Sequence, residues 1–172
     1  QRADLLAMER DVLAEIAAPA AAAGVVLCVE TLFGRMTEWT PSPVELAGQI
    51  RAVDHPHIRA TIDFSHVFLN AGERGYDPMA ELAELAPLAR HLHIHDSFGT
   101  PRSFAQYDRG EAILFGLGDL HLPPGRGNLP WKELATLPFE GPTVANLELT
   151  TRHADQLADA VAWTRAWIGR AG

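Results

Sequence analysis

The spacing of hydrophobic residues along the chain predicts helices that alternate with short strands. Aliphatic side chains recur every three or four positions over residues 3–22, which is typical of an amphipathic helix that ends near Pro19 and Gly24. Helical spacing also predicts helices at residues 43–53, 79–88, 130–134 and 152–168. Ser42-Pro43 supports the start of the second helix, because proline is favoured in a first helical turn.

Short apolar runs rich in β-branched residues predict four strands, at residues 25–30, 58–63, 90–95 and 143–148. The first run is typical of a strand buried on both faces. A polar loop through Gly72 and Gly75 is expected after the second strand. Strands that alternate with helices indicate an α/β fold with a parallel sheet. No composition break divides the chain, so we expect residues 1–172 to form a single domain.

Composition and charge narrow the classes of function. With 47% hydrophobic residues among 172, the chain can bury a core, which excludes a disordered protein. Acidic residues outnumber basic ones 22 to 14, a net charge of -8 that disfavours binding to nucleic-acid phosphates. No run of 18 apolar residues is present to span a membrane. The single cysteine, Cys28, excludes an intrachain disulfide and favours a reducing compartment, so we expect a cytoplasmic protein.

Each predicted strand ends in a side chain that can bind a cation. The carboxyl ends of parallel strands form the ligand face of such folds. Alternation along the third strand places His91, His93 and His95 on one side, opposite Leu92 and Ile94. An oxygen-rich set with one nitrogen suits Mn²⁺, Mg²⁺ or Co²⁺, with Zn²⁺ possible. The alternative for each member is a strand-end cap or surface ion pair. The four residues are Glu30, Asp63, His93 and Glu148.

The order of these motifs resembles the metal site of a known superfamily. Val26–Glu30, Thr61–His66 with its Asp-x-x-His spacing, His91–Asp96 with His-x-x-Asp, and Asn146–Glu148 resemble the xylose isomerase-like TIM barrels. That group includes sugar phosphate isomerases, epimerases and endonuclease IV. The resemblance implies (β/α) units of a TIM barrel, and here the C-terminal four, because a whole barrel takes about 250 residues. It also implies one divalent metal ion held by the four strand-end residues.

The resemblance implies roles for further residues. His66 would lie beside the substrate or at a second metal position, with a histidine packed under the next loop as the alternative. Asp96 would orient His93. Asp119 and His121 match the spacing of a pair that binds an additional zinc in endonuclease IV. His95 lies one strand repeat beyond His93, where it could face the pocket mouth.

The segment from Gly118 to Trp131 resembles a glycine-containing loop of the same superfamily. The amides of Gly125 and Gly127 would approach a substrate phosphate or hydroxyl, and Arg126 would supply charge. The alternative is a plain turn. The preceding insertion is long enough to form a lid, with apolar anchors at Phe98, Phe104, Tyr107 and Phe115.

These motifs favour an enzyme of carbohydrate metabolism, a metal-dependent sugar or sugar phosphate isomerase or epimerase. Glu30 and Glu148 are the candidate acid/base pair, transferring a proton through a metal-stabilised enediolate. One alternative is an endonuclease IV-like phosphodiesterase, against which the charge of -8 counts. Another is an inactive half-barrel. The expected partners are a sugar or polyol, no nucleic acid and no membrane, and either a second copy of the chain or a missing N-terminal half.

Overall fold

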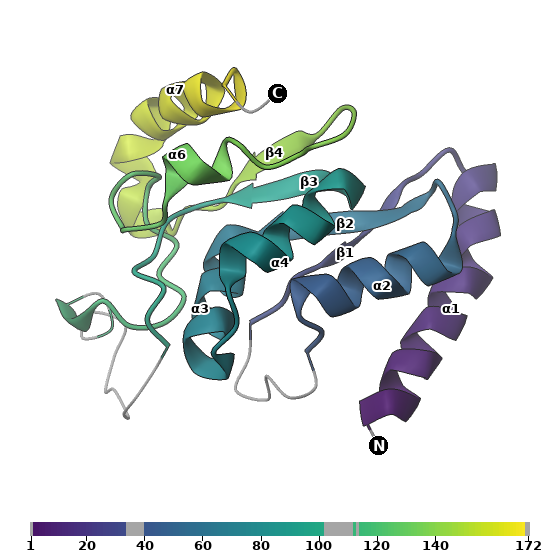
Figure 1. Ribbon diagram of the computed structural model, residues 1–172. Coiled ribbons are helices and arrows are strands. Elements are labelled where there is room, and N and C mark those ends of the chain that lie inside the picture. The colour runs from purple at the N-terminus through teal and green to yellow at the C-terminus, as the bar shows by residue number, and fades with distance from the viewer. Residues whose placement is uncertain (1, 34–39, 102–111, 113, 171–172) are drawn as a thin grey trace.

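The computed structural model describes residues 2–33, 40–101, 112 and 114–170, and its helices and strands alternate as the hydrophobic pattern predicts. Figure 1 shows them in chain order from the N-terminus to the C-terminus. They are α1 (Arg2–Ala22), β1 (Leu27–Glu30), α2 (Pro43–Val53), β2 (Ile58–Asp63), α3 (Phe64–Arg74), α4 (Pro78–Leu85), the 3₁₀ helix η1 (Ala86–Leu88), β3 (Ala89–Ile94), α6 (Trp131–Leu134), β4 (Val144–Leu147), the 3₁₀ helix η2 (Thr151–Gln156) and α7 (Leu157–Ile168).

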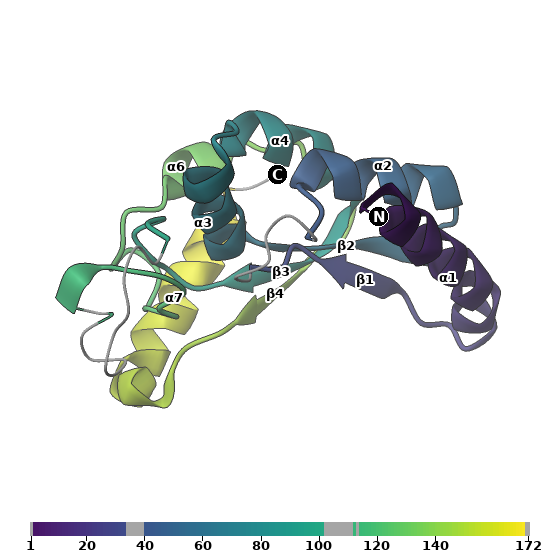
Figure 2. The same ribbon diagram turned by 90° about the horizontal axis from the view of Figure 1, so that it is seen from below.

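The four described strands form one parallel sheet in the order β1-β2-β3-β4. Helices α2, α4 and α6 cover one face of this sheet, while α1 stands beyond the β1 edge (Figure 2). The sheet curves, so its strand–helix units form part of a TIM barrel wall rather than a flat layer. The strands end toward a common edge, and the site described below lies there.

The core lies between the sheet and the helices. In β2, Ile58, Ala60 and Ile62 alternate along the strand and are fully buried, as the period of two requires. They pack in one cluster with buried side chains of α2, of α4 and of the neighbouring strand β3. Burying a large aliphatic side chain stabilises a fold by about 1.5–3 kcal/mol. The apolar residues of the strands therefore hold the sheet to the helices and leave its other face to polar side chains.

The first strand differs from its prediction. β1 begins only at Leu27, and all its residues are half-buried rather than buried on both faces. Val25 and Val26 precede the strand and are 47% and 44% exposed. Among the described residues β1 pairs only with β2, so it is an edge strand and lacks a neighbour to bury its other side.

A helix replaces the polar loop that was predicted after β2. The Asp63 side chain accepts a hydrogen bond from the backbone N–H of His66 at 3.0 Å, which caps α3. Phe64, Val67 and Leu69 of this helix are fully buried. Gly75, at φ 75°, ends it in the left-handed conformation that glycine adopts without steric cost. The residues that suggested a loop, among them Gly72 and Glu73, form the exposed last turn of α3.

Other helix boundaries follow local chemistry. Ser42 and Glu45 form a reciprocal capping box at the start of α2, as Ser42-Pro43 indicated. Helix α1 continues past Pro19 to Ala22, so the proline lies within its last turns and does not end it there. Within the described residues, no helix has the length and apolar character needed to cross a membrane.

The expected lid is only partly described. Phe104 and Tyr107 lie outside the described residues. Phe98 packs against a small cluster formed by Ala112, Leu120 and Leu122. Phe115 is 56% exposed and does not serve as a buried anchor.

Candidate metal centre

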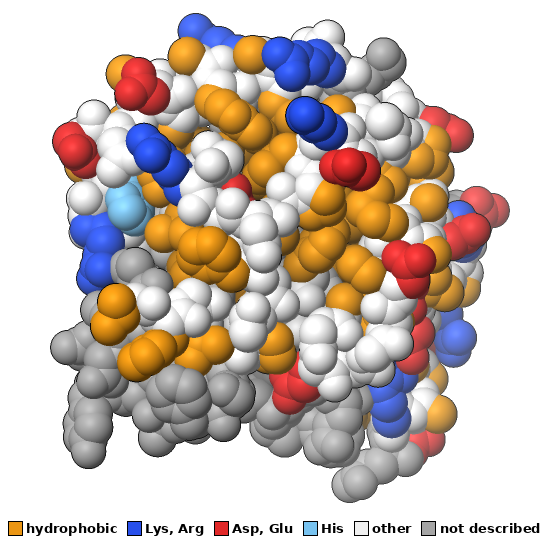
Figure 3. Space-filling model, turned by 60° about the vertical axis from the view of Figure 1, so that its left-hand side comes forward, with side chains coloured by type: hydrophobic (Ala, Val, Ile, Leu, Met, Phe, Trp, Pro, Cys, Tyr) orange, Lys and Arg blue, Asp and Glu red, His pale blue; other side chains and the backbone are white. Residues whose placement is uncertain are grey.

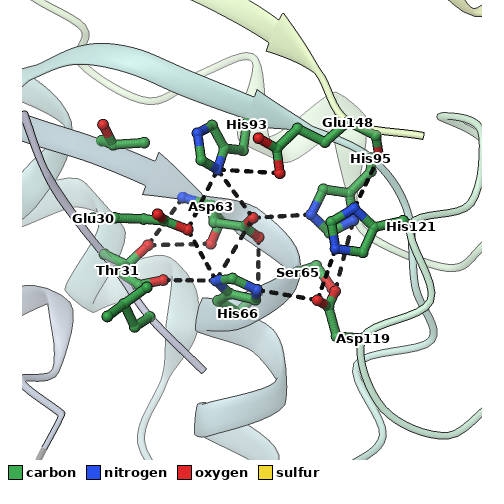
Figure 4. A network of polar contacts seen from close by, with 12 residues as sticks. Glu30, Thr31, Asp63, Ser65, His66, His93, His95, Asp119, His121 and Glu148 are labelled. Carbon is green, nitrogen blue, oxygen red and sulfur yellow. Dashed lines mark hydrogen bonds and ion pairs between the residues drawn. The ribbon is translucent and has the colours of Figure 1, made fainter. Parts of the chain in front are cut away.

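Polar side chains from all four strands meet at the carboxyl edge of the sheet (Figure 4). Glu30 ends β1, Asp63 ends β2, His93 lies near the end of β3, and Glu148 directly follows β4. In the register, Asp63 lies beside His93 and His93 beside Asn146, while Glu30 pairs with Thr61 one repeat lower. The four predicted ligands are therefore staggered along the sheet and still converge.

His93 is the centre of this convergence. Its Nδ1 atom lies 3.3 Å from Glu30 Oε1, 3.5 Å from Asp63 Oδ2 and 3.5 Å from Glu148 Oε2. The atom is buried, and no described residue forms a hydrogen bond with it. Burying a ring nitrogen against three carboxylates without a well-formed hydrogen bond costs free energy, unless a cation binds between these groups.

The charges of the cluster shift its pKa values in opposite directions. The Asp63 carboxylate, with smaller contributions from Glu148 and Glu30, raises the pKa of His93 although burial opposes the charged ring. Burial also opposes ionisation of Asp63, yet His93, His95 and His66 together hold its pKa well below the usual range. Asp63 is therefore a permanent anion in a water-excluded position, as a cation ligand requires.

Asp63 is oriented by several bonds. Its backbone N–H donates to Thr31 Oγ1 at 2.9 Å, and its Oδ1 atom caps α3. The Oδ2 atom faces the cluster, 2.9 Å from His95 Nε2 and 3.6 Å from His66 Nδ1. Because Oδ1 is engaged by the backbone, Asp63 offers the site one oxygen of defined direction.

His66, Asp119 and His121 form a second group beside the first (Figure 4). Asp119 Oδ2 lies 3.2 Å from His66 Nε2 and 2.8 Å from His121 Nε2. The Nδ1 atoms of the two rings face backbone carbonyls, Thr31 O at 3.0 Å for His66 and Glu148 O at 3.0 Å for His121. Carbonyls and carboxylates only accept, so doubly protonated rings satisfy all four contacts.

The pKa values agree with protonated rings. Burial would lower the pKa of His66, but the hydrogen bond to Asp119 and the charges of Asp63 and Asp119 raise it to about 9. Asp119 likewise raises the pKa of His121. Burial disfavours the charged form of Asp119, but both histidines hold its pKa well below the usual range. A cation bound to this second group would have to displace those ring protons.

His95 has a position that the sequence did not indicate. It was expected at the pocket mouth, but its side chain is fully buried and its Nε2 lies 2.9 Å from Asp63 Oδ2. Alternation correctly placed His95 on the His93 face of the strand. The depth of the ring depends on α3 and the Asp119 loop, which pack over it.

Asp96 does not orient His93. Its carboxylate is fully buried on the other side of the chain, where it accepts bonds from Gly125 N at 2.8 Å and from Trp131 Nε1 at 2.9 Å. The backbone of Asp96 also pairs with Leu122 in an antiparallel bridge. Asp96 therefore anchors the loop that follows His121, since strand alternation directs it away from His93.

The glycines and Arg126 also lie away from the cluster. A Cβ atom on Gly127 would collide with Ser97 O and the Asp96 carboxylate, so this glycine serves close packing of the chain on itself. The N–H of Gly125 is used by Asp96 rather than left free for a substrate. Arg126 is exposed and borders a hollow beside α7. The structure therefore does not bring Arg126 to the predicted site.

The donor atoms fit a divalent cation at the first group or between it and His66. Glu30, Asp63 and His66 offer ligand atoms within 4.8 Å of one another, and so do Asp63, His93 and Glu148. Both sets share Asp63, whose Oδ2 atom lies 3.6 Å from His66 Nδ1 and 3.5 Å from His93 Nδ1, and carboxylate oxygens dominate them. Hard or borderline divalent ions prefer such donors.

Comparisons with known proteins agree with this architecture. The family model of the xylose isomerase-like TIM barrel matches residues 1–167. No curated protein matches the chain. A similar solved structure is the apo form of 3-keto-D-glucoside 4-epimerase from E. coli, with a TM-score of 0.58 and 20% identity. The match covers 94% of this chain and 53% of the epimerase, so the chain spans about half of that protein's length. The match of the family model to residues 1–167, together with the parallel strand–helix units, shows that the chain belongs to the xylose isomerase-like TIM barrel family.

Proposed function

We propose that the chain carries the metal-binding half of a sugar or polyol isomerase or epimerase. The observation that carries this proposal is the environment of His93 Nδ1, which three carboxylates from three strands approach within 3.5 Å. The family and an epimerase of similar fold support a small-molecule sugar substrate. Glu30, Asp63, His93 and Glu148 would hold one divalent ion, with Mn²⁺, Mg²⁺ or Co²⁺ better suited than Zn²⁺.

A bound divalent ion would supply Lewis acidity toward adjacent carbonyl and hydroxyl oxygens of the substrate. The proton transfers belong to Glu30 and Glu148, which come from the two outer strands and flank His93. Each side chain is 29% exposed, so both can reach a substrate entering from solvent. One glutamate removes a proton from carbon, and the other returns one on the opposite face in an epimerisation. Asn146 donates to Glu148 Oε1 at 2.9 Å and so orients this carboxylate.

The proposal is tested by solvent exchange and metal binding together. Aldoses, ketoses and 3-keto-glucosides are incubated with the protein and Mn²⁺ in D₂O, and deuterium incorporation at carbon is followed by NMR. Glu30→Gln and Glu148→Gln should each abolish incorporation, because an amide cannot accept the proton. Glu140→Gln, which changes an exposed glutamate, is the matched control. Exchange that persists in both site variants would refute the acid/base assignment.

A metal-dependent phosphodiesterase is the second candidate, and the contacts of Asp119 with His66 and His121 favour it. It would need a cation at this second group, whose rings now share protons with Asp119. On the face drawn in Figure 3, Lys and Arg side chains are scattered among hydrophobic and acidic ones, which does not suit a nucleic-acid backbone. Metal analysis separates the candidates, since more than one tightly held zinc per chain would favour the phosphodiesterase.

We propose further that residues 1–172 act as one domain that completes its barrel with additional strand–helix units. In the described sheet β1 and β4 each have a neighbour on one side only. The exposed residues of α1 include an apolar stripe at helical spacing, formed by Leu5, Met8, Val12 and Ile16. The additional units would come from a second copy or from a preceding N-terminal half. Light scattering after size-exclusion chromatography tests the first source, and an inactive monomer would instead support the half-barrel reading.

The compartment is a proposal as well. Cys28 is a free, half-buried thiol, and burial raises its pKa, which disfavours the reactive thiolate. This is compatible with the reducing cytoplasm that the single cysteine suggested.

A further inference from the structure

His95 lies between the two groups of the centre. Its ring is fully buried at the end of β3, with Asp63 on one side and the Asp119 and His121 side chains on the other (Figure 4). A buried imidazole between two anions is well placed to transmit a change at one of them to the other. The proton-transfer mechanism gives it no role.

On the first side, His95 sets the direction of the Asp63 ligand oxygen. Asp63 Oδ2 is 2.9 Å from His95 Nε2, and Asp63 Oδ1 is bonded to the backbone of α3. A carboxylate only accepts, so His95 Nε2 carries the hydrogen. These two bonds fix the rotation of the carboxylate, and the bond from His95 acts on the oxygen that faces the site.

On the second side, His95 supports the Asp119 loop. Its ring stacks on His121 with centroids 4.0 Å apart and planes 5° apart. Its Nδ1 atom lies 3.8 Å from Asp119 Oδ1 and has no hydrogen-bond partner among the described residues. His121 has φ 48°, a left-handed conformation that is costly for a residue with a side chain. The stacked ring is therefore one of the contacts that hold His121 in this conformation.

We propose that His95 is a positioning residue that couples cation binding at Asp63 to the arrangement of Asp119 and His121. The inference rests on the proposed cation at Asp63. It adds that Asp119 and His121 change the affinity for this cation through the ring of His95. The ring is rigid and enclosed, so a shift of Asp63 moves the face on which His121 is stacked. Outer-shell partners of this kind typically change metal affinity by about 10- to 100-fold.

Two substitutions separate the two sides of the ring. His95→Phe keeps an aromatic face for His121 but removes the donor to Asp63, so Mn²⁺ affinity should fall by about 10- to 100-fold. His95→Gln retains a donor that can reach Asp63 but removes the stacked ring, so Mn²⁺ affinity should fall by about fivefold, the part that the second group contributes through the ring, and less than in His95→Phe. Isothermal titration with Mn²⁺ measures both. Equal affinity in wild type and His95→Phe would overturn the role at Asp63.

A double-mutant cycle tests the coupling itself. In the wild-type background, Asp119→Asn should weaken Mn²⁺ binding by about tenfold. With His95→Phe or His95→Gln present, the same change should weaken Mn²⁺ binding only about twofold. This remainder is the direct electrostatic effect of the Asp119 charge on the cation. An undiminished cost in both backgrounds would overturn the coupling. The two His95 variants make the cycle independent of whether one of them folds, which circular dichroism and thermal unfolding without metal establish.

The outcomes also separate this inference from the function on which it rests. Wild-type protein that binds no Mn²⁺ would refute the proposed cation site. Wild-type binding with additive effects of His95 and Asp119 would leave the cation site standing and refute the coupling. The Mn²⁺ resonance in electron paramagnetic spectra gives a second measure, because a reoriented Asp63 oxygen changes the ligand field while a merely less stable protein does not.

Discussion

The strand ends and the segment from Gly118 to Trp131 carry equally suggestive polar motifs, but the structure treats them differently. All four strand-end residues converge on one point. Only part of the loop reaches the centre: Asp119 and His121 lie there, whereas Gly125 and Arg126 lie away from it. The carboxylate of Asp96, which accepts hydrogen bonds from Gly125 and Trp131, supports the loop rather than the centre. A strand sends alternate residues to a known face, whereas a loop has no such period.

The comparison predicts different effects for substitutions at two buried aspartates, Asp63 and Asp96: the first should mainly lower metal affinity and the second should mainly lower stability. Asp63→Asn should lower Mn²⁺ affinity by more than about 100-fold, because a ligand should cost more than an outer-shell partner. Its unfolding free energy should also fall, because the neutral amide no longer balances the charge of the neighbouring rings, but by less than in Asp96→Ala, since asparagine still caps α3. Isothermal titration and urea unfolding measure the two effects. Unchanged metal affinity would show that Asp63 is a structural cap only.

Asp96→Ala should instead lower the unfolding free energy by about 3 kcal/mol or more, because it leaves the Gly125 amide and the Trp131 indole without their acceptor. Urea unfolding monitored by tryptophan fluorescence gives the value. Mn²⁺ affinity of the folded fraction should fall less than in Asp63→Asn. The opposite pattern, lost affinity at full stability, would return Asp96 to the role of orienting His93.

The protonation of the centre predicts a pH dependence of metal binding. The pKa of His93 is raised, so a cation held by this ring must displace its proton up to a higher pH than at an ordinary imidazole, and His66, whose pKa is raised to about 9, keeps a positive charge beside the site. Affinity for Mn²⁺ should therefore increase as pH rises toward the pKa of His66, by up to about tenfold per unit for each proton released. Titration calorimetry in buffers of different ionisation enthalpy counts the protons. Affinity that is flat with pH would mean that the rings are already neutral.

The smallest effect belongs to Arg126, which the sequence placed near the substrate. Arg126→Ala should alter stability by no more than about 0.5 kcal/mol, since the side chain is exposed and away from the centre. Substrate exchange in D₂O should be equal to that of the wild type. A clear rise in the substrate concentration needed for half-maximal rate would show that Arg126 reaches the substrate after all.

Much of the fold follows from short-range patterns. β2 matches its predicted residues 58–63, and the other strands differ by one or two residues at their ends. α3 was missed because its polar residues and the glycines near its end suggested a loop, while its cap depends on the side chain of Asp63. The exposure of β1 was missed because burial of an edge strand depends on which strands lie beside it.

The sequence by itself determined which strand faces carry polar residues, where the strands lie to within one or two residues, and which side chains stand near their ends, because these depend on a period of two residues. Only the tertiary structure decided the depth of His95, the pairing of Asp119 with two rings, and the turning of Asp96 toward Trp131. These contacts join residues more than 30 positions apart, or depend on a loop whose path has no repeating pattern. Their geometry is fixed by packing, and packing is a property of the folded chain as a whole.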